Sequence, residues 1–113
     1  AGADLLLMPS KSEPCGLSQM IAMRYGTVPI VRETGGLKDT VHPYEAWCGA
    51  GNGFTFAGYS AHELYDACCR AQDRYYSKED WNNLIRYDME CDFSWDVSAK
   101  SYEGLYNETA NLW

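Results

Sequence analysis

A short, continuously apolar run near the start of the chain constrains the fold more than any other feature. Leu5-Leu6-Leu7-Met8 contains no polar residue, and Pro9-Ser10 ends it. Such a run is typical of a strand whose two faces are both covered, as in a parallel sheet flanked by helices. The run therefore predicts a buried parallel strand as the first element of the chain.

The segments that follow alternate as a parallel sheet requires. Residues 17–25 predict a helix, and Gly26 can supply the left-handed turn that ends it. Residues 28–31 and 53–56 predict two further strands, with a short helical piece at residues 37–41 between them. With right-handed crossovers, this order predicts a partial Rossmann-like α/β unit in three layers, with a parallel sheet of about three strands.

The remainder of the chain is predicted to be helical. Ser60 and Glu63 have the spacing of a capping box, and Ser77 with Asp80 repeats the pattern at the start of a second helix. A last helix is predicted from about Asp96, and one of its faces would carry Tyr102, Leu105, Tyr106, Thr109 and Trp113. Because three strands are few for a free-standing sheet, we expect one sheet edge to need a neighbour that this chain lacks.

Composition excludes several classes of function. The 113 residues, 46% of them hydrophobic, suffice for one folded domain spanning residues 1–113, and the net charge of -7 argues against nucleic acid and anionic membranes as partners. There is no apolar run long enough to span a membrane, and a cytoplasmic location is expected. The five cysteines lack metal-ligand spacing, so we expect reduced thiols, no metal and no cofactor. The first residues, which lack an initiator Met, suggest that the chain continues upstream.

The loop after the first strand is the best candidate for a binding site. In open parallel sheets, ligands bind where strands end and helices begin. We expect the first backbone amides of the following helix to lie at about Cys15, Gly16, Leu17 and Ser18. Their unpaired N–H groups and the positive end of the helix dipole favour binding of an anion. Glu13 would lie beside that anion and accept hydrogen bonds from hydroxyl groups. A phosphate that carries hydroxyl groups on its far side describes a sugar nucleotide.

Simpler interpretations of the same residues exist. A glutamate before a helix stabilises that helix by about 0.3–1 kcal/mol without any ligand. Likewise, Thr34-Gly35-Gly36 forms a loop after the second strand, and adjacent glycines form tight turns at least as often as phosphate-binding loops. From spacing alone, both interpretations stay open.

The residues themselves carry a more specific signal. The stretch ADLLLMPSKSEPCGLSQMIAMRYGTVPIVRETGGLKDTV closely resembles a region of bacterial glycogen synthases and plant starch synthases, in particular through Glu-Pro-Cys-Gly-Leu and Thr-Gly-Gly-Leu. NGFTFAGYSAHELYDACCRA and DFSWDVSAKSYEGLY resemble later segments of the same family. The resemblance implies a GT-B glycosyltransferase that transfers glucose from ADP-glucose to the non-reducing end of an α-1,4-glucan with retention. It also implies that this chain is the second half of the C-terminal domain.

The resemblance also implies a role for each site residue. Glu13 corresponds to the active-site carboxylate beside the donor glucose, and the backbone amides of Cys15 and Gly16 contact the same sugar. Leu17 and Ser18 correspond to the helix start that holds the distal phosphate. Residues 34–36 border the cleft.

Two departures from the family pattern bear on these roles. Ile21 stands where many related GT-B enzymes have a second acid for the ribose. The cations that bind the donor diphosphate, and the acceptor site, belong to parts of the family that this chain lacks. Because one helix terminus offers about +0.5 charge against about -2 on a diphosphate, we expect weak donor binding and no transfer by this chain alone.

Other functions remain as alternatives. A non-catalytic half-domain that binds a sugar nucleotide or a glucan would use the same loop without turnover. A GT-B transferase that uses a UDP-sugar fits as well, because no base-reading residue is identifiable. A receiver-like signalling domain ranks last, because no paired acids follow the first strand.

Overall fold

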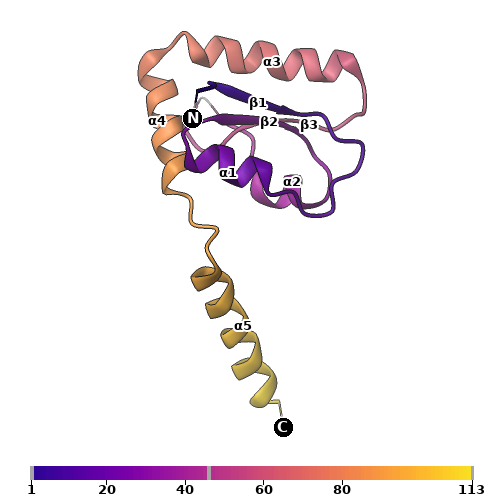
Figure 1. Ribbon diagram of the computed structural model, residues 1–113, viewed down its shortest axis with the longest axis vertical. Coiled ribbons are helices and arrows are strands. Elements are labelled where there is room, and N and C mark those ends of the chain that lie inside the picture. The colour runs from indigo at the N-terminus through magenta and orange to yellow at the C-terminus, as the bar shows by residue number, and fades with distance from the viewer. Residues whose placement is uncertain (1, 46, 113) are drawn as a thin grey trace.

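The computed structural model describes residues 2–45 and 47–112 and shows an α/β unit followed by a separate helix (Figure 1). The elements in chain order are β1 (Leu5–Met8), α1 (Ser18–Arg24), β2 (Val28–Arg32), α2 (Gly35–Thr40), β3 (Phe54–Phe56), α3 (Ala61–Tyr75), α4 (Lys78–Glu90) and α5 (Trp95–Ala110). Each predicted strand and helix is present, with ends displaced by a few residues.

The three strands form one parallel sheet in the order β1-β2-β3. Leu6 pairs with Pro29, and Ile30 pairs with Phe54. The central strand β2 is buried along residues 28–31, because both of its faces are covered. This burial explains why its sequence is apolar at consecutive positions. The predicted parallel sheet is confirmed, but the predicted burial of β1 on both faces is wrong, because β1 lies at the end of the strand order and its residues are half-buried or exposed.

Helices cover both faces of the sheet (Figure 1). On one face, α3 and α4 pack against the alternate side chains of β2 and β3. The buried members of this main core are Val28, Ile30, Phe54, Phe56, Ala67, Ala71, Trp81 and Leu84. On the other face, Leu37 and Val41 of the α2 region pack against Val31. Ile30 and Val31 therefore serve opposite layers, as the alternation of a strand dictates.

Local sequence signals set several of the element ends. Gly26 follows α1 with a φ of 80°, so the predicted left-handed turn is confirmed. At the start of α3, the Ser60 hydroxyl accepts a hydrogen bond from the Glu63 amide at 3.2 Å, as a capping box predicts. At α4, the Ser77 hydroxyl donates instead to the Asp80 carboxylate at 3.1 Å.

The last helix departs from the layered arrangement. We predicted helices that cover the sheet, but α5 extends away from the unit and has no buried residue among those described (Figure 1). Tyr102, Leu105 and Tyr106, predicted to share one face, are all exposed, whereas Trp113 of the same predicted face lies outside the described residues. The helix begins at Trp95, one residue before the predicted start. Within residues 2–45 and 47–112, the helices are too short or too polar to cross a membrane.

Candidate functional site

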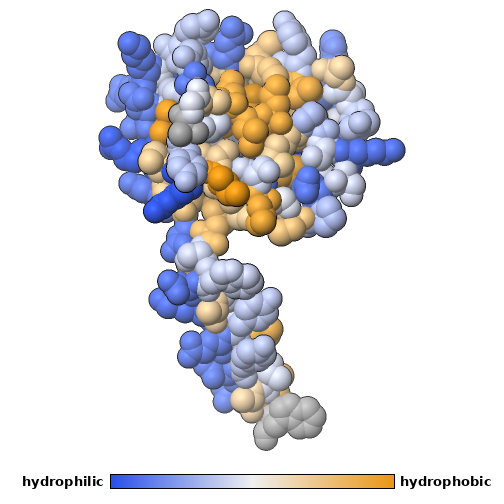
Figure 2. Space-filling view, viewed as in Figure 1, coloured by the Kyte–Doolittle hydropathy of each residue, from blue (hydrophilic) through white to orange (hydrophobic). Residues whose placement is uncertain are grey.

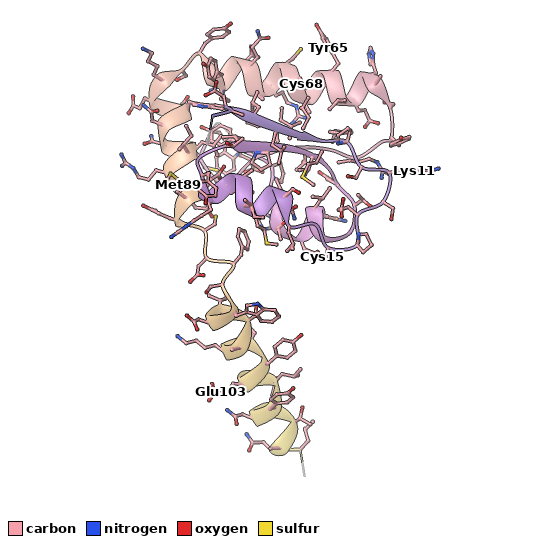
Figure 3. All side chains as sticks on the ribbon, in the orientation of Figure 1. Lys11, Cys15, Tyr65, Cys68, Met89 and Glu103 are labelled. Atoms are coloured by element: carbon pink, nitrogen blue, oxygen red, sulfur yellow. The ribbon has the colours of Figure 1, made fainter. Side chains whose placement is uncertain are left out.

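The predicted site lies where β1 and β2 end. The loop of residues 9–17 leaves β1 and runs beside the start of α2, so it brings Glu13 close to Gly35 and Gly36. Glu13 is half-buried, and its carboxylate accepts a hydrogen bond from the Ser10 hydroxyl at 3.4 Å. Lys11, by contrast, points outward at the far end of the loop (Figure 3). The structure thus brings together the two motifs that the sequence places about twenty residues apart.

The two loops meet through backbone atoms. The Gly36 amide donates to the carbonyl oxygens of Glu13 at 3.1 Å and Pro14 at 3.2 Å. A Cβ atom on Gly36 would overlap the carbonyl oxygen of Cys15, and one on Gly35 would overlap that of Glu13. Gly35 also has a φ of 49°. The glycine pair is therefore required by the close approach of the Glu13 loop.

The structure corrects the predicted start of both helices. Gly35 and Gly36 are the first residues of α2 rather than a loop, and only Thr34 precedes the helix as its N-cap. α1 begins at Ser18, so Cys15 and Gly16 lie before the helix and their amides are not part of its first turn. Gly16, with a φ of 73°, turns the chain toward α1. A glycine with this geometry delays the helix, which the apolar spacing alone could not indicate.

Sequence reasoning missed Gln19, which is completely buried beneath the Glu13 loop. Its side-chain amide donates to the Gly16 carbonyl at 2.8 Å and to the Thr40 hydroxyl at 3.1 Å. The same nitrogen lies 3.4 Å from the Cys15 carbonyl. A glutamine among apolar helix positions was the available signal, because a buried amide requires hydrogen-bond partners.

Arg32, at the end of β2, was also missed. Its guanidinium donates to the carbonyl of Lys11 at 2.8 Å and approaches the carbonyl of Ser10 at 3.4 Å. It also stacks over the Tyr59 ring at 5.7 Å from the ring centre. A positive charge therefore lies at the same sheet edge as the Glu13 loop, but it is engaged in holding that loop.

A pocket of about 310 Å³ opens at this edge on the α3 side. Its lining residues are mostly apolar: Pro9, Phe56, Tyr59, Ser60, Ala61 and Leu64.

The carboxyl group whose pKa is shifted furthest lies at the opposite edge of the sheet, where the strands begin. Asp88 on α4 is buried, and burial raises its pKa to about 8. Its neighbour Met89 lies at the far end of the sheet from Lys11 (Figure 3), so Asp88 does not belong to the Glu13 site.

The described residues contain no group of three or more His, Cys, Asp or Glu side chains that could hold a metal ion. Cys15, Cys48, Cys68, Cys69 and Cys91 are free thiols in the structure. Cys15 is exposed on the Glu13 loop (Figure 3).

Residues 1–85 match the family model described as "Glycosyl transferases group 1". The chain belongs to this family. It is 57% identical to glycogen synthase of Lachnospira eligens over 95% of its own length and 56% identical to glycogen synthase of Desulfitobacterium hafniense over 94%. It spans only 23% of the length of each of these two relatives.

Solved structures confirm the fold of this glycosyltransferase chain. The catalytic domain of Starch Synthase IV from Arabidopsis thaliana, bound to ADP and acarbose, matches 96% of the chain with 44% identity and a TM-score of 0.82, and the chain covers 23% of that protein. Sucrose-phosphate synthase from Thermosynechococcus elongatus matches 98% of the chain with 27% identity and a TM-score of 0.67, and the chain covers 26% of it. The predicted resemblance to glycogen and starch synthases and the predicted GT-B type of α/β fold are both confirmed.

Proposed function

We propose that this chain is the second half of the C-terminal, donor-binding domain of a glycogen or starch synthase. The whole enzyme transfers glucose from ADP-glucose to the non-reducing end of an α-1,4-glucan with retention of configuration. The close packing of the Glu13 loop on Gly35 and Gly36 is the observation that carries the proposal, because it places a carboxylate and the starts of two helices at one sheet edge.

The open edge of β1 supports the placement within a larger domain. In the described part of the chain, β1 pairs with β2 alone, and Leu7 is 51% exposed. Figure 2 shows hydrophobic residues gathered on the face of the unit around the sheet. Unpaired strand edges with exposed apolar residues are rare in complete domains, because they promote aggregation. A strand from upstream sequence beside β1 would satisfy this edge.

Each site residue then has a defined task. Glu13 accepts hydrogen bonds from the donor glucose and stabilises the positive charge that develops at its anomeric carbon. The amides of Cys15 and Gly16 contact the same sugar, while the backbone at Leu17 and Ser18 faces the distal phosphate. Thr34, Gly35 and Gly36 form the floor and border of the cleft. The acceptor hydroxyl attacks from the face that the diphosphate leaves, so one carboxylate suffices.

Charge decides what this chain contributes by itself. The α1 helix has only seven residues, and its terminus offers about half a unit of positive charge against a diphosphate. Arg32 is occupied by carbonyl groups. The remaining cations and the acceptor site must come from the rest of the enzyme. We therefore propose weak donor binding and no glucosyl transfer by the chain alone, in the cytoplasm where reduced thiols persist.

Glucan extension by the full-length protein tests the proposal. We expect incorporation of glucose from ADP-glucose, and we expect Glu13→Ala to lower kcat about 10²–10³-fold, because a group that stabilises transition-state charge is removed. Glu79→Ala, at an exposed glutamate on α4, is the matched control and should keep wild-type activity. Unaltered transfer in Glu13→Ala would contradict the assigned role.

Two alternatives give different results in the same assay. Transfer from UDP-glucose but not from ADP-glucose would indicate the UDP-sugar transferase. Donor or glucan binding that depends on Glu13, without any turnover in the full-length protein, would indicate a binding module.

A further inference from the structure

A closed set of hydrogen bonds links the Glu13 loop to both neighbouring helices. Gln19 on α1 donates to the Gly16 carbonyl at 2.8 Å and to the Thr40 hydroxyl at 3.1 Å. Thr40, at the end of α2, donates to the Gly36 carbonyl at 2.8 Å. Gly36 in turn donates to the Glu13 carbonyl at 3.1 Å. The chain of contacts therefore returns to the loop from which it starts.

The glutamine is costly as a packing residue. Gln19 is completely buried, and its side-chain carbonyl oxygen has no hydrogen-bond partner among the described residues. Leaving such a group unpaired costs about 1–3 kcal/mol. An apolar residue of the same length would avoid this cost and would pack as well beneath the loop. What only the glutamine supplies is a pair of N–H donors, which the Gly16 carbonyl and the Thr40 hydroxyl accept.

The position of the Gly16 carbonyl group determines where the site residues point. Gly16 lies three residues after Glu13, and a Cβ atom at Gly16 would lie 3.1 Å from Glu13 Cγ and 2.8 Å from Gln19 Oε1. The stem of the carboxylate thus packs against the peptide that Gln19 holds. Loss of the Gln19 donors would leave the peptides of Cys15 and Gly16 free to rotate, and would move their amides and Glu13 together.

From this geometry we propose that Gln19 is a positioning residue for glucosyl transfer, acting through Thr40 and the Gly16 carbonyl. The inference rests on the proposed function, because it takes the Glu13 loop to be the donor-glucose site. Gln19 does not touch the donor itself. It fixes the loop relative to α2, so that Glu13 and the amides of Cys15 and Gly16 face the sugar in one arrangement.

The test uses the full-length protein and two conservative changes. Gln19→Met keeps length and apolar packing but removes the donors, and we expect kcat to fall about 10- to 100-fold, since small displacements of reacting groups have effects of this size. KM for the glucan and the affinity for ADP, which lacks the glucose, should change by less than about threefold. Gln72→Met, the same change at an exposed glutamine of α3, is the matched control.

A second variant keeps the proposal testable if Gln19→Met does not fold. Thr40→Val removes the hydroxyl while retaining the shape, and we expect a smaller fall in kcat, whereas Thr40→Ser should restore activity. If both residues act through one network, the double variant Gln19→Met/Thr40→Val should lose less than the product of the two single losses.

A readout that does not depend on turnover separates this inference from the proposed function. Hydrogen exchange of peptides covering residues 12–18 should become about tenfold faster in Gln19→Met, with exchange in α3 unchanged. A wild-type protein without transferase activity would overturn the proposed function, and the loop exchange would still decide whether Gln19 holds the loop. Unchanged loop exchange, or unchanged kcat in a folded and active enzyme, would overturn the inference.

Discussion

The buried polar side chains at the two edges of the sheet, where the strands end and where they begin, differ in their hydrogen bonding. At the edge where the strands end, Gln19 is buried and its amide donates to the Gly16 carbonyl of the Glu13 loop and to the Thr40 hydroxyl. At the edge where the strands begin, Asp88 is buried and neither carboxyl oxygen has a partner within the described residues. The first arrangement fixes a loop, while the second makes the local packing depend on pH.

The physical difference lies in what each group can do when no partner is present. A buried carboxyl group can bind a proton, which is why the pKa of Asp88 rises to about 8. A glutamine cannot relieve its burial by protonation, and Gln19 instead donates its amide N–H groups to the Gly16 carbonyl and the Thr40 hydroxyl. Gln19, beside the proposed site, is therefore held by the geometry of its hydrogen bonds. The burial of Asp88, at the opposite edge, depends instead on whether its carboxyl group is protonated.

The largest effect should come from Asp88. Because its pKa is about 8 when folded against 3.8 as its ordinary value, the folded state binds the extra proton, and stability is lost as pH rises between these values. The expected slope is about 1.4 kcal/mol per pH unit, or on the order of 4 kcal/mol between pH 5 and 8. Asp88→Leu should flatten this dependence, as measured by thermal unfolding at several pH values.

Equal pH dependence in wild type and Asp88→Leu would show that the carboxyl group is paired or hydrated, and would remove the contrast between the two edges. A conservative companion is Asp88→Asn, which keeps the polar burial and removes the titration. It should also flatten the profile, but with lower stability than Asp88→Leu at every pH.

A smaller effect is expected at the Glu13 loop. Gly36→Ala would force a methyl group into the Cys15 carbonyl, so the loop must separate from α2. We expect a loss of about 3 kcal/mol in the free energy of unfolding, at the upper end of overpacking effects, together with loss of glucosyl transfer. Gly104→Ala is the control, because no atom in the described part of the chain, apart from the helix's own backbone and the adjoining residues, lies within 4 Å of a Cβ atom there.

That control should raise the stability of α5 by up to about 1 kcal/mol, because alanine favours a helix more than glycine does. Chemical denaturation of the variants measures both changes. If Gly36→Ala unfolds like wild type and stays active, the close seating of the two loops is not required for the site.

The sequence predicted the sheet well because each strand carries its own signal. Residues 5–8 and 28–31 are continuously apolar, which is typical of parallel strands, although only residues 28–31 are buried in the structure. Helix ends that depend on local capping, such as the one at Ser60, were also predicted correctly. These features require knowledge of only a few neighbouring residues.

The features that were missed depend on contacts between distant segments. Gly35 and Gly36 enter a helix because the Glu13 loop approaches them, and no local pattern indicates that approach. In the sequence, Gln19 is simply a polar residue on a short helix, because its contacts with Thr40 and the Gly16 carbonyl exist only in the folded structure. Similarly, α5 has a predictable helical pattern, but its separation from the sheet is a property of tertiary structure. The roles assigned to Glu13, Cys15, Gly16, Leu17, Ser18 and residues 34–36 stay predictions.

The central claim is that Glu13 faces the donor glucose, and a calorimetric comparison of two ligands tests it most directly. The full-length protein and its Glu13→Ala variant are titrated with ADP-glucose and with ADP. We predict that the variant binds ADP-glucose about tenfold or more weakly, by the loss of charge-assisted hydrogen bonds, and binds ADP as the wild type does. Equal affinity of both proteins for ADP-glucose, or an equal loss for both ligands, would contradict the account.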